Sequence, residues 1–179
     1  RGTLYPYVKS HSVYRCAADK AVVRAAEPRV KQSRTRSYAM EATLNVIITG
    51  MRMGPSDGMI WDLVGREAAV STPAETFGFL DVTSETIDSG AFHYNGNWGS
   101  NPRDPNAAYG LTRWGHLPAD RHAGAGALSY LDGHVAAHRW LYRKSGRPVD
   151  SAYADAKDLE DSRWLVRQMS WYHANARCW

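Results

Sequence analysis

The chain has 179 residues, which is long enough for one domain with a hydrophobic core and too short for two comfortable ones. Hydrophobic residues make up 44% of it and the net charge is +4, values close to those of ordinary globular domains. Length and composition therefore exclude a second domain of comparable size and a low-complexity chain, and no apolar run approaches the roughly 18 residues that a membrane-spanning helix needs.

Basic residues are concentrated at the start of the chain. Residues 1–36 hold nine Lys or Arg against two acids, a net charge of +7, so the remainder is slightly acidic. Such a segment can contact nucleic acid, and a steep salt dependence of DNA retention would indicate that it does. The charges are scattered among apolar residues without a binding motif, which favours a solvated basic face, and we expect no nucleic-acid partner.

The first predicted element is a linker over residues 1–10. Pro6 cannot lie deep inside a regular helix, so its apolar neighbours fit the last turn of a helix or the segment that leaves it. The stretch 37–42 has the character of a short strand, although its second half fits a helix equally well. Aromatic and β-branched residues predict a further strand over 76–82.

A long loop is predicted over residues 95–118, where Gly, Asn and Pro are dense. Its aromatic residues include Trp98, Tyr109 and Trp114. Long loops in compact domains are often functional or partner-facing. Two interpretations of the aromatic residues stay open: part of the aromatic surface meets a partner, or a few large rings fill a small core.

The clearest local signal is a hairpin over residues 127–138. Asp132-Gly133 between two strand-like runs predicts a two-residue turn, in which both central residues need positive φ. That turn pairs Leu131 with His134 and Tyr130 with Val135. The core face then contains Leu128, Tyr130, Val135 and Ala137, and the opposite face contains His134, Ala136, His138 and Trp140.

A helix is predicted over residues 155–172. Acidic residues at its start suit the helix dipole, and apolar residues follow at spacings that form one broad stripe. The stripe consists of Leu159, Trp164, Leu165, Met169 and Tyr172.

The H-x9-DG segment and five further blocks in the same order resemble the prepilin-type proteins that carry a C-terminal H-x9-DG domain. His122 is followed by nine residues and then Asp132-Gly133, in surroundings similar to the family's RHxG and aDGHV signature. Three upstream blocks, which begin at Leu4, Val13 and Arg36, resemble the family's LYPYVK, vYxCPaD and rSYsmN sequences. A fourth, which begins at Thr76, resembles its strand ending in Asp. A block at Ser162 resembles the tryptophan-leucine helix seen in many members. Three departures are Ala17 in place of the usual Pro, Glu41 near the usual Asn, and the absence of the N-terminal helix from this sequence.

The resemblance implies an α+β fold, a pilin-like head with an antiparallel β-sheet, a C-terminal helix and long aromatic loops. Residues 1–179 would form one domain, in which 1–10 link to a missing N-terminal helix and 120–140 form the H-x9-DG hairpin. The implied function is structural and not enzymatic: a subunit of a pseudopilus-like or other extracytoplasmic filament or membrane-anchored assembly, without a cofactor. Its partners would be other copies or a hydrophobic pilin-type helix from a neighbouring chain, with the membrane reached through the missing segment.

The same comparison gives the expected site residues. One polar cluster at the end of the sheet would contain His122, Asp132, Gly133 and possibly Asp81. A helix-docking surface would contain Leu4, Tyr5, Tyr7 and Val8, buried against the head or a neighbouring chain. An exported protein with two cysteines usually pairs them, so we expect a Cys16–Cys178 disulfide, with two free thiols as the alternative.

Two other functions stay open. A metal-binding module or hydrolase could use His122, Asp132 and His134, because imidazole and carboxylate groups hold zinc and similar ions. The spacing matches no H-E-x-x-H or comparable template, and Asp132 already has a role in the turn. The chain could also be an exported accessory subunit of a larger membrane complex.

Overall fold

The structure is a computed structural model of the whole chain, and it describes residues 5–24, 31–42, 44, 70–87, 90–92 and 113–170. The elements in chain order are α1 (Tyr5–Val8), the 3-10 turn η1 (Ser12–Tyr14), β1 (Val22–Arg24), β2 (Lys31–Ser33), β3 (Tyr38–Glu41), the 3-10 turn η4 (Pro73–Glu75), β4 (Phe77–Asp81), β5 (Ala91–Phe92), β6 (Ala125–Tyr130), β7 (Val135–Arg139) and α2 (Ala156–Val166). No helix among these residues is both long enough and apolar enough to cross a membrane.

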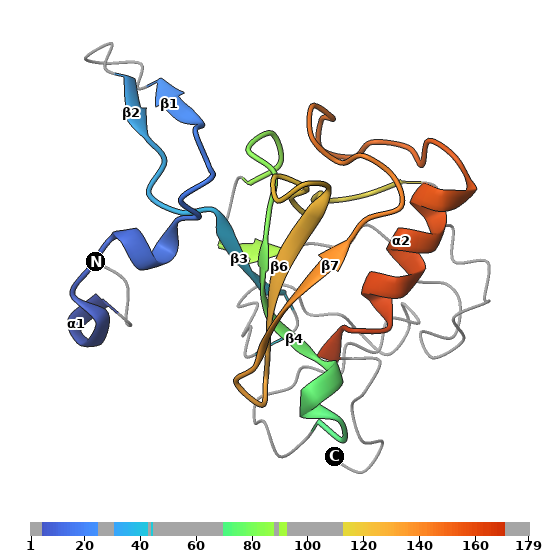
Figure 1. Cartoon of the computed structure of the whole chain (residues 1–179), viewed down its shortest axis with the longest axis horizontal. Helices are drawn as coiled ribbons and strands as arrows, with labels where there is room; N and C mark the ends of the chain where they lie inside the picture. The colour runs from blue at the N-terminus through green and yellow to red at the C-terminus, as the bar shows by residue number, and fades with distance from the viewer. Residues whose placement is uncertain are drawn as a thin grey trace, which may run out of the picture.

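A five-stranded sheet with the strand order β5-β3-β4-β6-β7 forms the centre of the protein. With α2 beside it, the sheet confirms the α+β class (Figure 1). Three of the four neighbouring pairs are antiparallel, but β3 and β5 are parallel, so the expectation of an antiparallel sheet is wrong at this edge. Strands β1 and β2 form a separate two-stranded ribbon that projects away from the sheet in Figure 1.

Strand β4 confirms the prediction for residues 76–82, and it contains one irregularity. Its register against β6 shifts between Phe77 and Phe79, with Gly78 between them. In a regular strand Phe77 and Phe79 would share a face, but the shift leaves Phe77 completely buried and Phe79 43% exposed. One phenylalanine therefore enters the core while the other lies on the opposite face of the sheet.

The H-x9-DG hairpin is present, but its predicted register is wrong by one residue. Ser129 pairs with Val135 and Leu128 with Ala136, so three residues form the loop instead of two. Gly133 has a positive φ of 92° and Asp132 does not, and the Gly133 amide donates to the Tyr130 carbonyl at 3.0 Å. This is a type I turn followed by a glycine bulge, which needs only one residue of positive φ.

The changed register exchanges the two faces of β7. Val135 is 69% exposed and Ala137 is also exposed, whereas Ala136 and His138 are half-buried and Trp140 is buried. The predicted core positions Val135 and Ala137 are therefore wrong. The ring of His138 instead stacks on Trp164 of α2, with 3.4 Å between ring centroids.

Helix α2 confirms most of the C-terminal helix prediction, and its buried side is partly acidic. Asp155 caps it by accepting hydrogen bonds from the amides of Lys157 and Asp158. Asp158 and Asp161, expected to favour the helix dipole from the surface, are buried instead. Both bind the ammonium of Lys144, at 2.6 and 2.7 Å.

The core lies between the sheet and α2. It contains Ala39, Phe77, Leu80, Leu128, Trp140 and Leu165, among other buried residues. Trp114 belongs to this core and donates its ring N–H to Asp158 at 2.9 Å, so for this residue the alternative of a large ring that fills the core is confirmed. Trp98, Tyr109 and most of the predicted long loop lie outside the described residues.

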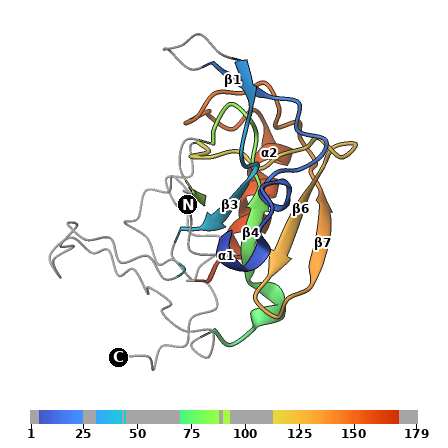
Figure 2. The same ribbon diagram turned by 90° about the vertical axis from the view of Figure 1, so that its left-hand side faces the viewer.

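The opposite face of the sheet forms an apolar groove of about 430 Å³ beside the N-terminal segment. Figure 2 shows α1 on this side of the sheet and α2 on the other. The residues that line the groove include Val8, Val13, Tyr38, Phe79, Ala127 and Val135.

The expected docking residues lie next to this groove. Tyr5 is half-buried, whereas Tyr7 is 83% and Val8 44% exposed, so the head itself does not bury the last two. Leu4 lies outside the described residues. Burial of these side chains by a neighbouring chain stays a prediction.

Candidate functional site

Four of the sequence blocks that carry the family resemblance converge at one place in the fold. Each contributes polar side chains from a different segment of the chain. The residues are Cys16 and Asp19, Ser37, Asp81, and Arg121 and His122, which we call the motif cluster. Residues up to 106 positions apart in the sequence are in contact here.

Asp81 is at the centre of the motif cluster. It is the last residue of β4, its backbone carbonyl accepts from the Ala119 amide at 2.7 Å, and its side chain is completely buried. Its Oδ1 accepts a hydrogen bond from the Arg121 guanidinium, which also donates to the Val82 carbonyl at 2.9 Å. Its Oδ2 is buried and has no hydrogen-bond partner in the structure.

A tight reversal of the chain brings His122 to Asp81. The amides and carbonyls of His122 and Ala125 bond reciprocally, at 3.2 and 3.1 Å, and Ala123 and Gly124 have positive φ of 53° and 84°. The reversal is therefore centred on Ala123 and Gly124, and glycine adopts such a positive φ without strain. It places Nε2 of His122 at 3.6 Å from Oδ2 of Asp81.

A hydrogen bond from its backbone amide holds Cys16 beside Ser37, the residue that precedes β3. Its amide donates to the Ser37 hydroxyl at 3.2 Å, and that hydroxyl donates to Asp19 at 2.6 Å. The thiol is buried, and its Sγ lies 3.2 Å from Nε2 of His122. Cys16 is a free cysteine, so the predicted bond to Cys178 is not formed in this structure, and Cys178 lies outside the described residues.

Burial is the largest single influence on the pKa values of Asp81, Asp19 and the neighbouring Tyr38. It raises the pKa of Asp81 to about 6, although the nearby Arg121 and His122 oppose this shift. Burial also acts to raise the pKa of Asp19, but hydrogen bonds from Ser37 and the Ala21 amide outweigh it and the pKa is lowered. The pKa of the Tyr38 hydroxyl is raised by burial and by the neighbouring Cys16 and Asp81.

The geometry separates two kinds of chemistry. A catalytic Cys–His–Asp relay needs the thiol at one ring nitrogen and the carboxylate at the other. Here Cys16 and Asp81 both approach the same nitrogen, Nε2 of His122. Both contacts therefore meet at one ring nitrogen, which differs from the arrangement of such a relay.

The predicted cluster of His122 with Asp132 is wrong. His122 precedes β6, whereas Asp132 and Gly133 lie in the turn at its other end, about 15–20 Å away at the usual rise of a strand. Asp132 binds its neighbour His134 instead, with 2.6 Å between the carboxylate and Nδ1, and both side chains are solvent-accessible. The metal or hydrolase set of His122, Asp132 and His134 is therefore not assembled.

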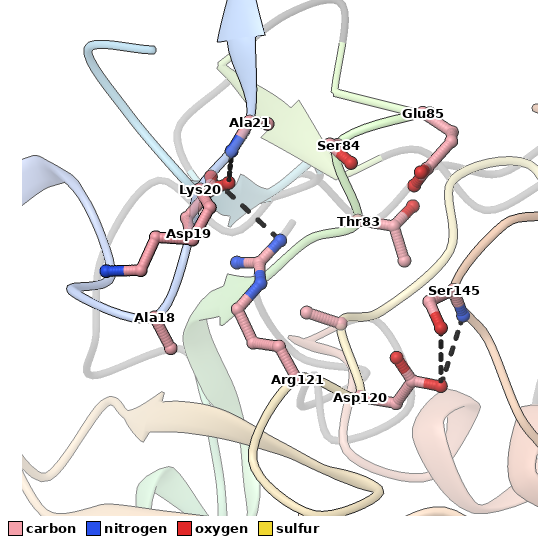
Figure 3. A pocket seen from close by; sticks show the side chains of 11 residues that line it. Ala18, Asp19, Lys20, Ala21, Thr83, Ser84, Glu85, Asp120, Arg121 and Ser145 are labelled. Atoms are coloured by element: carbon pink, nitrogen blue, oxygen red, sulfur yellow. Dashed lines mark hydrogen bonds and ion pairs between the residues drawn. The ribbon is translucent and has the colours of Figure 1, made fainter. Parts of the chain in front are cut away.

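Arg121, Asp19 and Ser37 were given no role by the sequence, although each lies inside a motif block. Their shared signal is position, because each is the first, second or last residue of its block. An open pocket of about 210 Å³ lies beside Asp19 and Arg121, and Figure 3 shows the Arg121 guanidinium pointing across it toward Asp19. The two side chains are 4.0 Å apart.

Comparison of the chain with protein-family models, with curated proteins and with solved structures finds no match.

Proposed function

We propose that the chain is the head of a pilin-like structural subunit, which works by assembly on the extracytoplasmic side of a membrane and not by catalysis. The observation that carries the proposal is the apolar groove on the face of the sheet opposite α2. It is flanked by the first described residues of the chain, which themselves expose Tyr7, Val8 and Val13.

The groove has the properties of a surface that is covered in an assembly. Phe79 and Val135, at 43% and 69% exposure, lie on one open sheet face next to Val8. Covering apolar surface contributes about 25 cal/mol per Å², and contiguous exposed apolar patches often mark interaction sites. We propose a hydrophobic helix of the pilin type as the occupant, because α1 already leads the chain along this face (Figure 2).

The motif cluster supports the same function by fixing the groove wall. It ties the segment that carries Val13 and Tyr14 to the end of β4 and to the loop before β6. The Ser37 amide donates to the Tyr14 carbonyl at 2.9 Å, which holds the groove side of this segment against β3. In this proposal the motif cluster stabilises the docking surface by holding the segment that carries Val13 against the sheet.

Site-specific photocross-linking in the producing cells tests the proposal. A photoreactive phenylalanine at Val135 should give an adduct whose peptide is a hydrophobic N-terminal segment of the same protein, identified by mass spectrometry. The matched control is the same group at Val149, an exposed valine outside the groove. Two results contradict the proposal: equal yields of adduct at Val135 and Val149, or adducts at Val135 that contain unrelated peptides and not this segment.

A further inference from the structure

We propose that Cys16, Asp81 and His122 form a binding site for a transition-metal ion of the zinc type. Their ligand atoms, one from each side chain, all lie within 4.8 Å of one another. They come from the segment after η1, the end of β4 and the loop before β6, so the fold and not the local sequence assembles them.

Two of the three distances between ligand atoms are close to those of a tetrahedral site. Zinc binds sulfur at about 2.3 Å and nitrogen or oxygen at about 2.0–2.2 Å, which places neighbouring ligand atoms about 3.3–3.7 Å apart. Nε2 of His122 lies 3.2 Å from Sγ of Cys16 and 3.6 Å from Oδ2 of Asp81. Two edges of the tetrahedron are therefore nearly formed, and the third, between Sγ of Cys16 and Oδ2 of Asp81, is no longer than 4.8 Å, so binding would draw these two atoms together by at most about 1.5 Å.

A second observation, independent of the cysteine, points to a cation. Asp81 is completely buried, yet its Oδ2 has no hydrogen-bond partner in the structure. A buried carboxylate oxygen without a partner costs free energy that an ion would recover. Arg121 binds the other oxygen, Oδ1, and so turns Oδ2 toward Cys16 and His122, as outer partners of metal ligands commonly do.

The donor set selects the class of ion. Calcium and magnesium prefer ligands that are all oxygen, whereas one thiolate, one imidazole and one carboxylate suit zinc and its borderline neighbours. The His122 side chain is 43% exposed, so solvent reaches the site. Water then completes the fourth position, and the negative charges of the thiolate and the carboxylate balance the divalent ion.

The alternative is a thiol–imidazole hydrogen bond with no ion. That contact accounts for the 3.2 Å between Cys16 and His122, but it leaves Oδ2 of Asp81 unsatisfied. It also leaves unexplained why the Cys16 thiol and the Asp81 carboxylate both approach Nε2 of His122. An ion accounts for all three observations at once.

The experiment is a cobalt(II) titration of the purified, chelator-treated chain in a Cys178→Ser background, where Cys16 is the remaining thiol. One equivalent of cobalt should produce thiolate-to-cobalt charge-transfer absorption with the visible bands of a tetrahedral site, and zinc should displace it. Cys16→Ser should abolish the charge-transfer absorption. His122→Ala and Asp81→Asn should weaken zinc binding, measured by competition, by at least about tenfold.

The matched control is His134→Ala. His134 also pairs with a carboxylate, Asp132, but at the far end of β6, so this variant should bind zinc as the parent does. Zinc should also raise the melting temperature of the parent and of His134→Ala, but not that of His122→Ala. The His122 side chain is half-exposed, so its removal takes no residue from the hydrophobic core. Absence of the charge-transfer absorption, its persistence in Cys16→Ser, or equal weakening in His134→Ala and His122→Ala overturns the proposal.

Discussion

Arg121 and Asp81 form an ion pair in which the carboxylate is completely buried and the guanidinium is only 16% exposed. Removing one partner of a buried pair leaves the other charge without compensation. We expect Arg121→Met to lower the free energy of unfolding by about 3 kcal/mol, measured by urea denaturation. Arg167→Met is the control, because its pair with Glu160 is largely exposed and should contribute at most about 0.5 kcal/mol. Equal losses in the two variants would contradict the assignment.

Lys144 should be the most sensitive single cation in the described part of the chain. Its completely buried ammonium lies between Asp158 and Asp161 and 4.8 Å from the centre of a Trp114 ring. Lys144→Met should cost about 3–5 kcal/mol because two buried carboxylates lose their shared partner. The neighbouring Arg143→Met, at an exposed position, should change the melting temperature little. A Lys144→Met protein as stable as the parent would show that these contacts do not hold α2.

His138 should make stability depend on pH. Burial lowers its pKa below the ordinary 6.5, nearby Lys144 acts in the same direction and Asp161 opposes it. The folded protein therefore binds this proton less readily than the unfolded chain, so the free energy of unfolding should fall as pH drops below about 6.5. His138→Phe keeps a ring against Trp164 and should flatten this slope in urea titrations at several pH values. An unchanged slope in His138→Phe would assign the dependence to another group.

Gly126 should not tolerate a side chain. A Cβ atom there would lie 2.5 Å from the Ala119 carbonyl oxygen, which also accepts a hydrogen bond from the Trp140 ring at 2.8 Å. Gly126→Ala should therefore lower stability by about 1–3 kcal/mol. Gly90→Ala is the comparison, because a Cβ there meets only the flexible end of Arg36, at 3.4 Å. Thermal unfolding of the two variants should rank them clearly, and the reverse order would contradict the close approach.

The free state of Cys16 is directly measurable. Denatured in alkylating reagent without reductant, the chain should gain two labels by mass spectrometry, because Cys16 is a free cysteine. A protein isolated from an oxidising compartment that gains none would restore the Cys16–Cys178 disulfide that the sequence suggested. It would also remove the thiolate from the proposed metal site.

Elements with strong local signals could be predicted from the sequence. Strand β4 and helix α2 follow from aromatic content and from apolar spacing with an N-terminal cap, and both lie close to where they were expected. The hairpin was placed correctly but its register was not, because Asp-Gly is compatible with two loop lengths that differ by one residue. A shift of one residue in the pairing of β6 with β7 was enough to exchange the faces of β7 on which Val135 and Ala136 lie.

Only part of the candidate site could be predicted from the sequence, because Arg121, Asp19 and Ser37 were given no role. His122 and Asp81 were both expected in one cluster, but Asp132 was added because it lies in the same motif as His122. Motif spacing measures distance along the chain, whereas a strand between two residues holds them apart. The contact of Cys16 with His122 spans 106 residues, and no local pattern carries such information.

That span gives the thiol a second use, as a reporter of folding. The contacts around Cys16 exist only when the N-terminal segment, the end of β4 and the loop before β6 are docked together, so the sulfur becomes exposed when this docking is lost. Contacts between segments so distant in sequence form late, after the loops between them have closed. In the native metal-free chain, reaction of Cys16 with an excess of thiol reagent that outpaces redocking should therefore measure the rate at which these three segments separate.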